Sequence, residues 1–371
     1  MQAHVERGLP GVVSLVSRGG ETHVPVAGQD YGRDTIFRIA SMSKPVTAVA
    51  AMILVEEGRL RLDDSLDDLL PEMANRRVLR TIESEVTDTI PANRSITLRD
   101  LLTFRFGHGF LMAAPGTYPF QADFAERFGS PGPPRPSETP APDEWMRRIG
   151  SVPLLAQPGE RWFYHLGSEI LGVLIARASG QYLGDFMKER IFDPLGMKDT
   201  GFHVPEEKID RLPKSMGMNF ETGKEIVYDE SAGGAWSRQP AFPSGGGGLV
   251  STADDYLAFG QMLLKGGAPI LSRPTVELMT TNHLTSVQQA GGKDILQPGR
   301  GWGFGMAVVT DRTGYPNVGS FGWDGGLGTS FLADPKEDLV GILLTQKMWT
   351  NPVPPPVCAD FWTLSYSAIA E

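Results

Sequence analysis

RIASMSKPVTAVAAMILVEEG, residues 38–58, combines a helical pattern of apolar residues with two reactive side chains at its start. Over residues 46–54 the apolar positions follow the spacing i, i+3, i+4, i+7 and i+8, which predicts one buried face of a helix. Pro45 is tolerated in the first turn of a helix but is damaging in its middle. The helix is therefore expected to begin near residues 42–44 and to end near Gly58.

Ser41 and Lys44 lie one helical turn apart at this expected helix start. Serine is a poor nucleophile at neutral pH and needs a base nearby. A lysine can take the serine proton once burial lowers its pKa, and a helix N-terminus stabilises developing negative charge. The same residues also fit a serine that caps the helix and a lysine exposed to solvent. The S-x-x-K pattern alone leaves both interpretations open.

Other catalytic arrangements find little support in the chain. There is no G-x-S-x-G, the six histidines form no H-E-x-x-H, and the glycine-rich segments 243–248 and 321–328 do not continue into G-K-[ST]. Cys358 is the single cysteine, which excludes an intrachain disulfide and a thiolate metal cluster. We expect neither a metal nor an organic cofactor.

Composition narrows the class of protein. The 371 residues are 41% hydrophobic and 21% charged, which is typical of a globular chain of about two domains. The net charge of −10 argues against nucleic acid as a partner. No apolar run reaches the roughly 18 residues of a membrane span, and no signal peptide is visible at the start, so a cytoplasmic location is expected. The sequence assigns no oligomeric state.

The order of expected elements predicts an α/β fold with an all-α insertion. Residues 11–27 resemble a hairpin, 61–103 a helical and acidic region, and 104–143 a long irregular segment. Further helices are expected at 168–180, 182–192, 251–267 and 358–370, and three consecutive strands at 301–309, 321–334 and 338–346. Strands at both ends predict a discontinuous α/β domain, 1–60 and 226–371, with a mostly helical domain, 61–225, inserted.

Several segments occur in an order that resembles one family. They are residues 37–66, 95–104, 157–180, 193–202, 244–263 and 321–328. This arrangement, from about residue 9 to about residue 346, is similar to the serine hydrolases of the class C β-lactamase family, which includes penicillin-binding peptidases and family VIII carboxylesterases. The resemblance implies an antiparallel β-sheet flanked by helices, an inserted helical domain, and an active site in the cleft between them.

The resemblance assigns roles to three residues. Ser41 matches the acylated nucleophile, Lys44 its activating partner, and Tyr164 the base or proton shuttle of a Y-x-N motif. The segment here is Tyr164-His165-Leu166, so the asparagine is missing, as in the esterase branch, which carries Y-S-L. An aromatic residue that merely packs beside Trp162 is the alternative for Tyr164.

The family's third motif, K-T-G, is replaced by Trp323-Asp324-Gly325. The esterase branch has W-G-G there, and an indole has one hydrogen-bond donor and no charge, so recognition of an anionic substrate loses support. Gly326 matches the position whose N–H completes an oxyanion hole with the N–H of Ser41. The resemblance places the wall of the acyl pocket in the irregular segment, and the expected substrate-binding residues are Trp323, Asp324, Gly325, Phe104, Phe106 and Leu166.

The predicted function is a serine hydrolase that cleaves small-molecule carboxylic esters through an acyl-enzyme on Ser41. Three alternatives stay open at this point. One is a β-lactamase or D-amino-acid peptidase of the same fold, against which the missing asparagine and lysine argue. A second is an acyltransferase to an alcohol acceptor, and a third is a non-catalytic binding protein on this fold.

Overall fold

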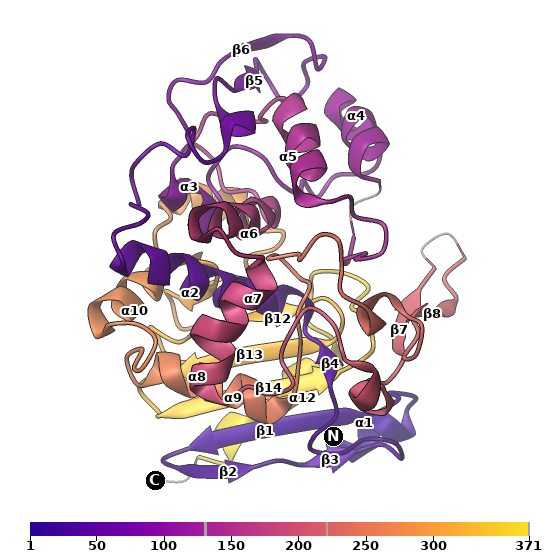
Figure 1. Cartoon of the computed structure of the whole chain (residues 1–371). Helices are drawn as coiled ribbons and strands as arrows, with labels where there is room; N and C mark the ends of the chain where they lie inside the picture. The colour runs from indigo at the N-terminus through magenta and orange to yellow at the C-terminus, as the bar shows by residue number, and fades with distance from the viewer. Residues whose placement is uncertain (130–131, 220–221, 370–371) are drawn as a thin grey trace.

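A computed structural model describes residues 1–129, 132–219 and 222–369 of the chain. Its centre is an eight-stranded antiparallel sheet in the order β10-β11-β12-β13-β14-β1-β2, with β3 also paired to β1 (Figure 1). The strands are β1 (Val12–Arg18), β2 (Glu21–His23), β3 (Val26–Ala27), β10 (Arg300–Trp302), β11 (Ala307–Val309), β12 (Phe321–Gly325), β13 (Thr329–Asp334) and β14 (Leu339–Thr345).

Two helices cover opposite faces of this sheet. Successive residues of a strand point to opposite faces. Val340 of β14 lies against Gly260 of α9 (Ala253–Leu264), whereas the next residue, Gly341, lies against Trp362 of α12 (Pro356–Ser367). The sheet is therefore buried on both faces, which explains why all seven residues of β14 are buried.

The remaining helices lie mainly above the sheet in Figure 1. They are α2 (Ser43–Glu56), α3 (Leu98–Leu102), α4 (Pro119–Phe128), α5 (Pro142–Ser151), α6 (Leu166–Ser179), α7 (Leu183–Met187), α8 (Asp193–Leu195), α10 (Arg273–Met279) and α11 (Ser286–Gly291), with α1 (Gln2–Glu6) beside the sheet. Helix α2 packs against α6, and residues of both belong to the main hydrophobic core. This contact brings the start of α2 close to the start of α6.

Three short strand pairs complete the structure. They are β4 (Phe37–Arg38) with β9 (Val250–Ser251), β5 (Arg77–Leu79) with β6 (Thr89–Pro91), and β7 (Ser215–Met218) with β8 (Glu225–Asp229). The first pair matters most for the site. It joins the segment just before α2 to the residues that follow the glycine-rich segment 243–248.

Several expected elements are confirmed and others are corrected. Helix α2 begins at Ser43 as predicted, and Gly180 directly follows α6 in the left-handed conformation. The region 61–103, however, consists of turns, the 3-10 helix η2 (Pro71–Met73), the β5–β6 pair and the short helix α3. Two of its aspartates bind side chains instead of lining a helix: Asp63 pairs with Arg99 at 2.7 Å, and Asp67 accepts a hydrogen bond from Ser95.

Two further corrections concern the last strands of the sheet and the segment 104–143. The three strands expected over 301–346 are five, because Gly305 and Gly328 adopt positive φ values of 73° and 109° and turn the chain within two of the predicted segments. The segment 104–143, expected to be irregular, contains α4 and the start of α5. Residues 130–131 of that segment lie outside the described residues.

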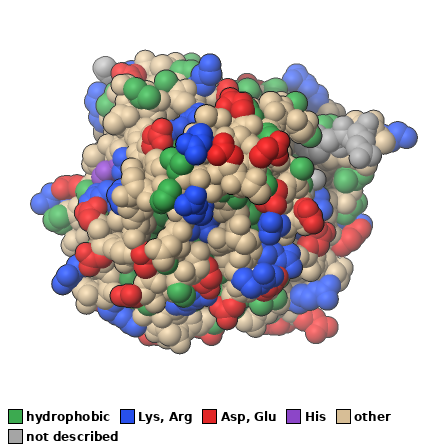
Figure 2. All heavy atoms as spheres, turned by 90° about the horizontal axis from the view of Figure 1, so that it is seen from above, with side chains coloured by type: hydrophobic (Ala, Val, Ile, Leu, Met, Phe, Trp, Pro, Cys, Tyr) green, Lys and Arg blue, Asp and Glu red, His purple; other side chains and the backbone are tan. Residues whose placement is uncertain are grey.

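The charge distribution on the surface and the length of the helices relate to the expected absence of nucleic-acid binding and of a membrane span. Figure 2 shows basic and acidic side chains interspersed on the face seen from above, with hydrophobic ones scattered among them. Across the described residues, no helix is long and apolar enough to cross a membrane.

The division into domains 1–60 with 226–371 and 61–225 stays a prediction, although strands from both chain ends do share one sheet.

Candidate active site

Ser41 and Lys44 meet at the junction of two helical segments. Ser41 lies in the 3-10 helix η1 (Ala40–Met42), which runs directly into α2. Ala40 has a φ of 43°, an uncommon value for a residue with a side chain, so the backbone just before Ser41 is strained. The Lys44 ammonium donates to Ser41 Oγ at 2.8 Å. The one-turn spacing in the sequence thus becomes a direct contact.

Lys44 is fully buried although it carries an ionisable group. Burial lowers the pKa of Lys44 to about 7, and the negative charge of Glu169 opposes that shift only in part. Its Nζ atom also donates to the Gly246 carbonyl at 2.5 Å and lies 4.7 Å from the centre of the Tyr164 ring. A lysine with this pKa is partly neutral at physiological pH and has the capacity to accept a proton.

Tyr164 lies across the site from Lys44 and touches the third-motif segment. Burial raises the pKa of Tyr164, while hydrogen bonds with Ser41 and Trp323 act in the opposite direction. The Trp323 indole N–H donates to the Tyr164 hydroxyl at 2.6 Å. Because this is the only donor of an indole, Trp323 has no donor left for a substrate.

Gly325 and Gly326 differ sharply in what surrounds them. A Cβ atom at Gly325 would overlap the Thr329 hydroxyl and the Ile39 carbonyl oxygen, so this glycine lets β12 approach the segment that carries Ser41. A Cβ atom at Gly326 would meet no heavy atom within 4 Å. Gly325 therefore has a packing role, whereas Gly326 faces open space beside Ser41.

Asp324, which the sequence left without a specific role, belongs to a cross-strand network. It stands opposite Ser330 in the β12–β13 register and accepts a hydrogen bond from the Ser330 hydroxyl, which in turn accepts one from the Trp362 indole at 3.0 Å. Burial raises the pKa of Asp324. These bonds tie the strand that carries Trp323 to α12.

A cavity of about 250 Å³ lies over these residues. Its lining includes Ser41, Tyr164, Trp323, Asp324 and Gly326, together with largely apolar neighbours: Phe110, Met112, Ile295, Trp349 and Pro352. The structure thus brings five of the predicted site residues together around one space. Lys44 does not line the cavity itself and contacts these residues through its hydrogen bond to Ser41.

Besides Gly325, three residues that were expected to bind substrate lie outside this lining. Phe106 is fully buried in the main core, and Phe104 is fully buried beneath Tyr164, where its ring stacks on Trp302 at 4.8 Å. Leu166 lines a second, neighbouring cavity with His165.

Two polar residues of the site, His165 and Glu169, were not predicted from the sequence. His165 Nδ1 lies 3.2 Å from Lys44 Nζ, and His165 Nε2 lies 3.2 Å from Glu169 Oε1. Burial and the charge of Lys44 lower the pKa of His165. The available signal was the histidine inside the Tyr164-His165-Leu166 motif, with an acid four residues later on the same helix face.

Comparison with known proteins agrees with this geometry. The sequence profile described as Beta-lactamase matches residues 1–356. Protein Rv1367c of Mycobacterium tuberculosis (strain ATCC 25618 / H37Rv) is 37% identical over 86% of this chain and 79% of its own length. Esterase EstB of Burkholderia gladioli is 31% identical over 93% of this chain and 88% of its own.

The fold is also found among solved structures. EstCE1, described as a hydrolase with promiscuous acyltransferase activity, superposes with a TM-score of 0.77 at 26% identity. The superposition covers 94% of this chain and 92% of EstCE1. Both the sequence and the arrangement of elements are therefore shared over nearly the whole chain.

Proposed function

The chain belongs to the β-lactamase family, and we propose that, as a serine hydrolase of this fold, it cleaves carboxylic esters through an acyl-enzyme on Ser41. The observation that carries this proposal is the contact between Ser41 Oγ and a buried lysine whose pKa is about 7. A base with a pKa close to the working pH is the most effective partner for a serine nucleophile.

In the proposed reaction, neutral Lys44 takes the proton of Ser41 while Oγ forms a bond to the ester carbonyl carbon. The N–H groups of Ser41 and Gly326 stabilise the negative oxygen of the tetrahedral intermediate. Tyr164 then passes a proton to the departing alcohol as the C–O bond breaks. Water attacks the acyl-enzyme in a second addition and elimination, which releases the acid and frees Ser41.

The composition of the cavity supports an uncharged ester as substrate. The one donor of Trp323 is taken by Tyr164, and the side chains around it are mainly apolar. None of the described residues that line the cavity is Lys, Arg or His, so the lining has no basic side chain to pair with a substrate carboxylate. A β-lactam or a peptide C-terminus is anionic, so these features disfavour both.

The test compares short-chain nitrophenyl esters with a chromogenic cephalosporin, using the wild type and Ser41→Ala. We expect ester hydrolysis that is lost in the variant, with little turnover of the cephalosporin. Full ester turnover in Ser41→Ala would contradict the mechanism, and fast cephalosporin turnover without esterase activity would contradict the substrate class. Adding a short-chain alcohol and measuring the new ester separates acyl transfer from hydrolysis.

Labelling by a fluorophosphonate provides a check that needs no ester substrate. Such reagents form a bond to an activated serine oxygen. We expect one label per chain on Ser41 and none in Ser41→Ala. An unlabelled wild type would favour a binding protein built on this fold.

A further inference from the structure

Lys44 has three hydrogen-bond partners around Nζ: Ser41 Oγ at 2.8 Å, the Gly246 carbonyl oxygen at 2.5 Å and His165 Nδ1 at 3.2 Å. An ammonium group has three N–H bonds, whereas the neutral amine has two N–H bonds and one lone pair. When the carbonyl and the imidazole accept those two N–H bonds, the lone pair faces Ser41 Oγ. The direction of the lone pair therefore depends on an acceptor at His165 Nδ1.

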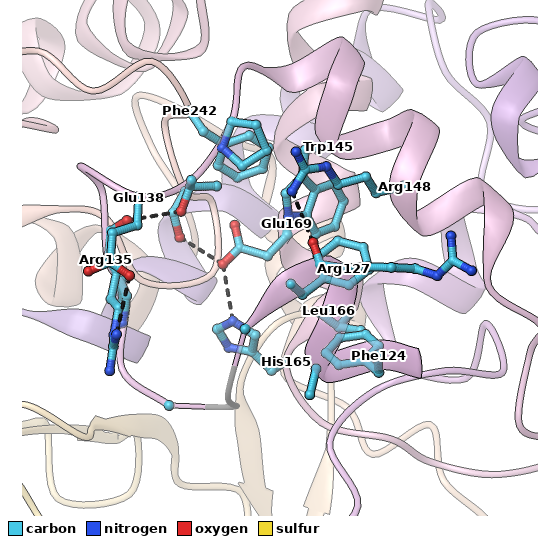
Figure 3. A pocket seen from close by; sticks show the side chains of 18 of the residues that line it. Phe124, Arg127, Arg135, Glu138, Trp145, Arg148, His165, Leu166, Glu169 and Phe242 are labelled. Carbon is cyan, nitrogen blue, oxygen red and sulfur yellow. Dashed lines mark hydrogen bonds and ion pairs between the residues drawn. The ribbon is translucent and has the colours of Figure 1, made fainter. Parts of the chain in front are cut away.

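Glu169 determines which nitrogen of His165 is the acceptor. Burial opposes its ionisation, but hydrogen bonds from His165 and Ser244 and the charge of Lys44 together lower the pKa of Glu169. The ionised carboxylate only accepts hydrogen bonds, so the hydrogen of the imidazole is on Nε2 and the lone pair is on Nδ1. Ser244 donates to the same carboxylate oxygen at 2.7 Å, and Figure 3 shows the contact between His165 and Glu169.

The backbone holds His165 in a strained conformation that aims its ring. His165 has φ 85° and ψ −64°, and the Leu166 N–H donates to the Tyr164 carbonyl at 3.3 Å, which defines a rare γ-turn. The imidazole also stacks on Phe110 with ring centres 4.7 Å apart. Strain of this kind persists where the surroundings impose it, and it is concentrated at functional sites.

The residues of the Tyr164-His165-Leu166 motif indicate why His165 supplies the acceptor for Lys44. The third residue of the family's Y-x-N motif is Leu166 here, and leucine has no polar side-chain atom. Gly246 leaves the room that the arrangement needs, since a Cβ atom there would lie 2.5 Å from Glu169 Oε1. The middle residue of the motif thus supplies a polar partner that the third residue lacks.

We propose that His165 and Glu169 are positioning residues for the base of the reaction: Glu169 fixes the imidazole, and the imidazole aims the lone pair of Lys44 at Ser41. The inference rests on the function proposed above. As Oγ bonds to the carbonyl carbon, its proton moves to Lys44, which becomes an ammonium with three N–H bonds and three acceptors. The negative charge of Glu169 offsets the positive charge that forms. That proton leaves later, through Tyr164, with the alcohol.

Glu169 lines the second cavity. This cavity measures about 380 Å³, and Figure 3 shows Glu169 and His165 on its wall below Trp145 and Phe242. Glu169 Oε2 is buried and has no hydrogen-bond partner among the described residues. The other charged groups lining the cavity are Glu126, Arg127, Arg135, Glu138 and Arg148.

Each of those arginines forms an ion pair with a carboxylate three or four residues away in the sequence. Arg127 pairs with Asp123 at 2.7 Å and Arg148 pairs with Glu144 at 2.7 Å, while Arg135 pairs with Glu138. The charge of Glu169 therefore acts mainly on the buried groups behind it, which are His165 and Lys44.

The experiment follows the rate of Ser41 labelling by a fluorophosphonate from pH 5 to pH 10. The labelling rate should fall on the acid side of this range, and this fall is the acid limb of the profile. In Glu169→Gln the loss of a negative charge favours the neutral lysine, so the acid limb should move to lower pH by about one unit. Glu126→Gln, a change of the same kind on the exposed rim of the same cavity, is the matched control and should leave the limb in place.

Two substitutions of His165 separate the acceptor from the ring. Asn tolerates a positive φ and can place its amide oxygen where Nδ1 lies, so His165→Asn should label at a rate close to the wild type. His165→Phe keeps an aromatic ring against Phe110 but has no acceptor, and the plateau rate should fall roughly tenfold or more. Thermal unfolding confirms that each variant is folded.

The outcomes separate this inference from the proposed function. A wild type that is not labelled at Ser41 at any pH overturns both. A labelled wild type, with an unmoved acid limb in Glu169→Gln, overturns the positioning role alone. The positioning role alone is also overturned if His165→Phe is labelled as fast as His165→Asn. If His165→Phe does not fold, the pH limb of Glu169→Gln still decides.

Discussion

Lys44 owes its chemistry to its place in the fold more than to its residue type. An exposed lysine has a pKa near 10.4 and is almost fully charged at neutral pH. In this protein Lys44 lies in the first turn of α2, and its side chain is buried against the glycine-rich segment 243–248. Its pKa falls to about 7 as a result. A pair that is a common helix start in sequence thereby gains the properties of a nucleophile and a base.

Replacement of Lys44 should remove most of the activity. Lys44→Met keeps a similar length in an apolar environment but has no proton acceptor, so kcat/KM for a nitrophenyl ester should fall by a factor on the order of 10² to 10⁴. Initial rates measure this loss, and thermal unfolding shows that the protein is intact. Lys188→Met, at an exposed lysine, should keep full activity. A Lys44→Met protein with more than about a tenth of the wild-type rate speaks against the mechanism.

The pH dependence should report the same lysine. Lys44 acts as a base only when it is neutral, so kcat/KM for an uncharged ester should be high above pH 7 and fall about tenfold per unit below it. Because the pKa of Tyr164 is raised, its hydroxyl stays protonated throughout, and a limb near 7 belongs to Lys44. Rates over pH 5–9 test this, and a flat profile would contradict it.

At the scale of elements, the site depends on how closely β12 approaches η1. The Thr329 hydroxyl donates to the Ile39 carbonyl at 3.1 Å, and Gly325 opposite it has no room for a side chain. The strand thus places Trp323 against Tyr164 and Gly326 beside Ser41. Substrate-binding and packing roles alternate along one short segment of chain.

Gly325→Ala and Gly326→Ala should therefore behave differently. An added methyl group at Gly325 overpacks the contact with Ile39, and we expect a loss of about 1–3 kcal/mol in the free energy of unfolding. At Gly326 the methyl group enters open space, so stability should stay near the wild type while ester hydrolysis drops. Denaturant unfolding and initial rates on both variants check this. Equal stability losses would refute the distinction.

At the scale of the whole molecule, long-range contacts hold the nucleophile segment in place. Strand β1 from the start of the chain pairs with β14 near its end over seven residue pairs. Arg38, three residues before Ser41, is buried and forms an ion pair with the buried Asp229 of β8. Arg38 also donates to the Pro213 and Glu230 carbonyls. Segments almost 200 residues apart in sequence therefore meet beside the site.

Breaking this buried ion pair should be costly. Asp229→Asn leaves the Arg38 charge buried without its carboxylate, and we expect a loss of about 3–5 kcal/mol in stability. Asp254→Asn removes one partner of the exposed Arg33–Asp254 pair and should cost about 1 kcal/mol or less. Urea unfolding with a fitted slope compares the two. A similar small effect for both would show that the buried pair contributes little.

The sequence alone determined the family and the fold class, and it identified Ser41, Lys44 and Tyr164 as the candidate catalytic residues. Short-range patterns were sufficient for α2, α6 and α9, because each has a periodic apolar face and a clear start or end. The predicted membership of the β-lactamase family and its antiparallel sheet with flanking helices are confirmed. The helix expected after residue 61 is wrong, since Asp63 and Asp67 bind distant side chains that no local pattern reveals, whereas the short helix α3 follows Thr97 as its cap.

Only the tertiary structure decided what surrounds each site residue. Burial of Lys44, the inward turn of Phe104 and Phe106, and the contact of Gly325 with Ile39 depend on segments far apart in the chain. The partnership of His165 with Lys44 likewise requires α2 and α6 to pack together. A sequence pattern specifies which groups are available and their spacing along one element. Their pKa values and directions follow from packing between elements, which is why they appeared only in the folded chain.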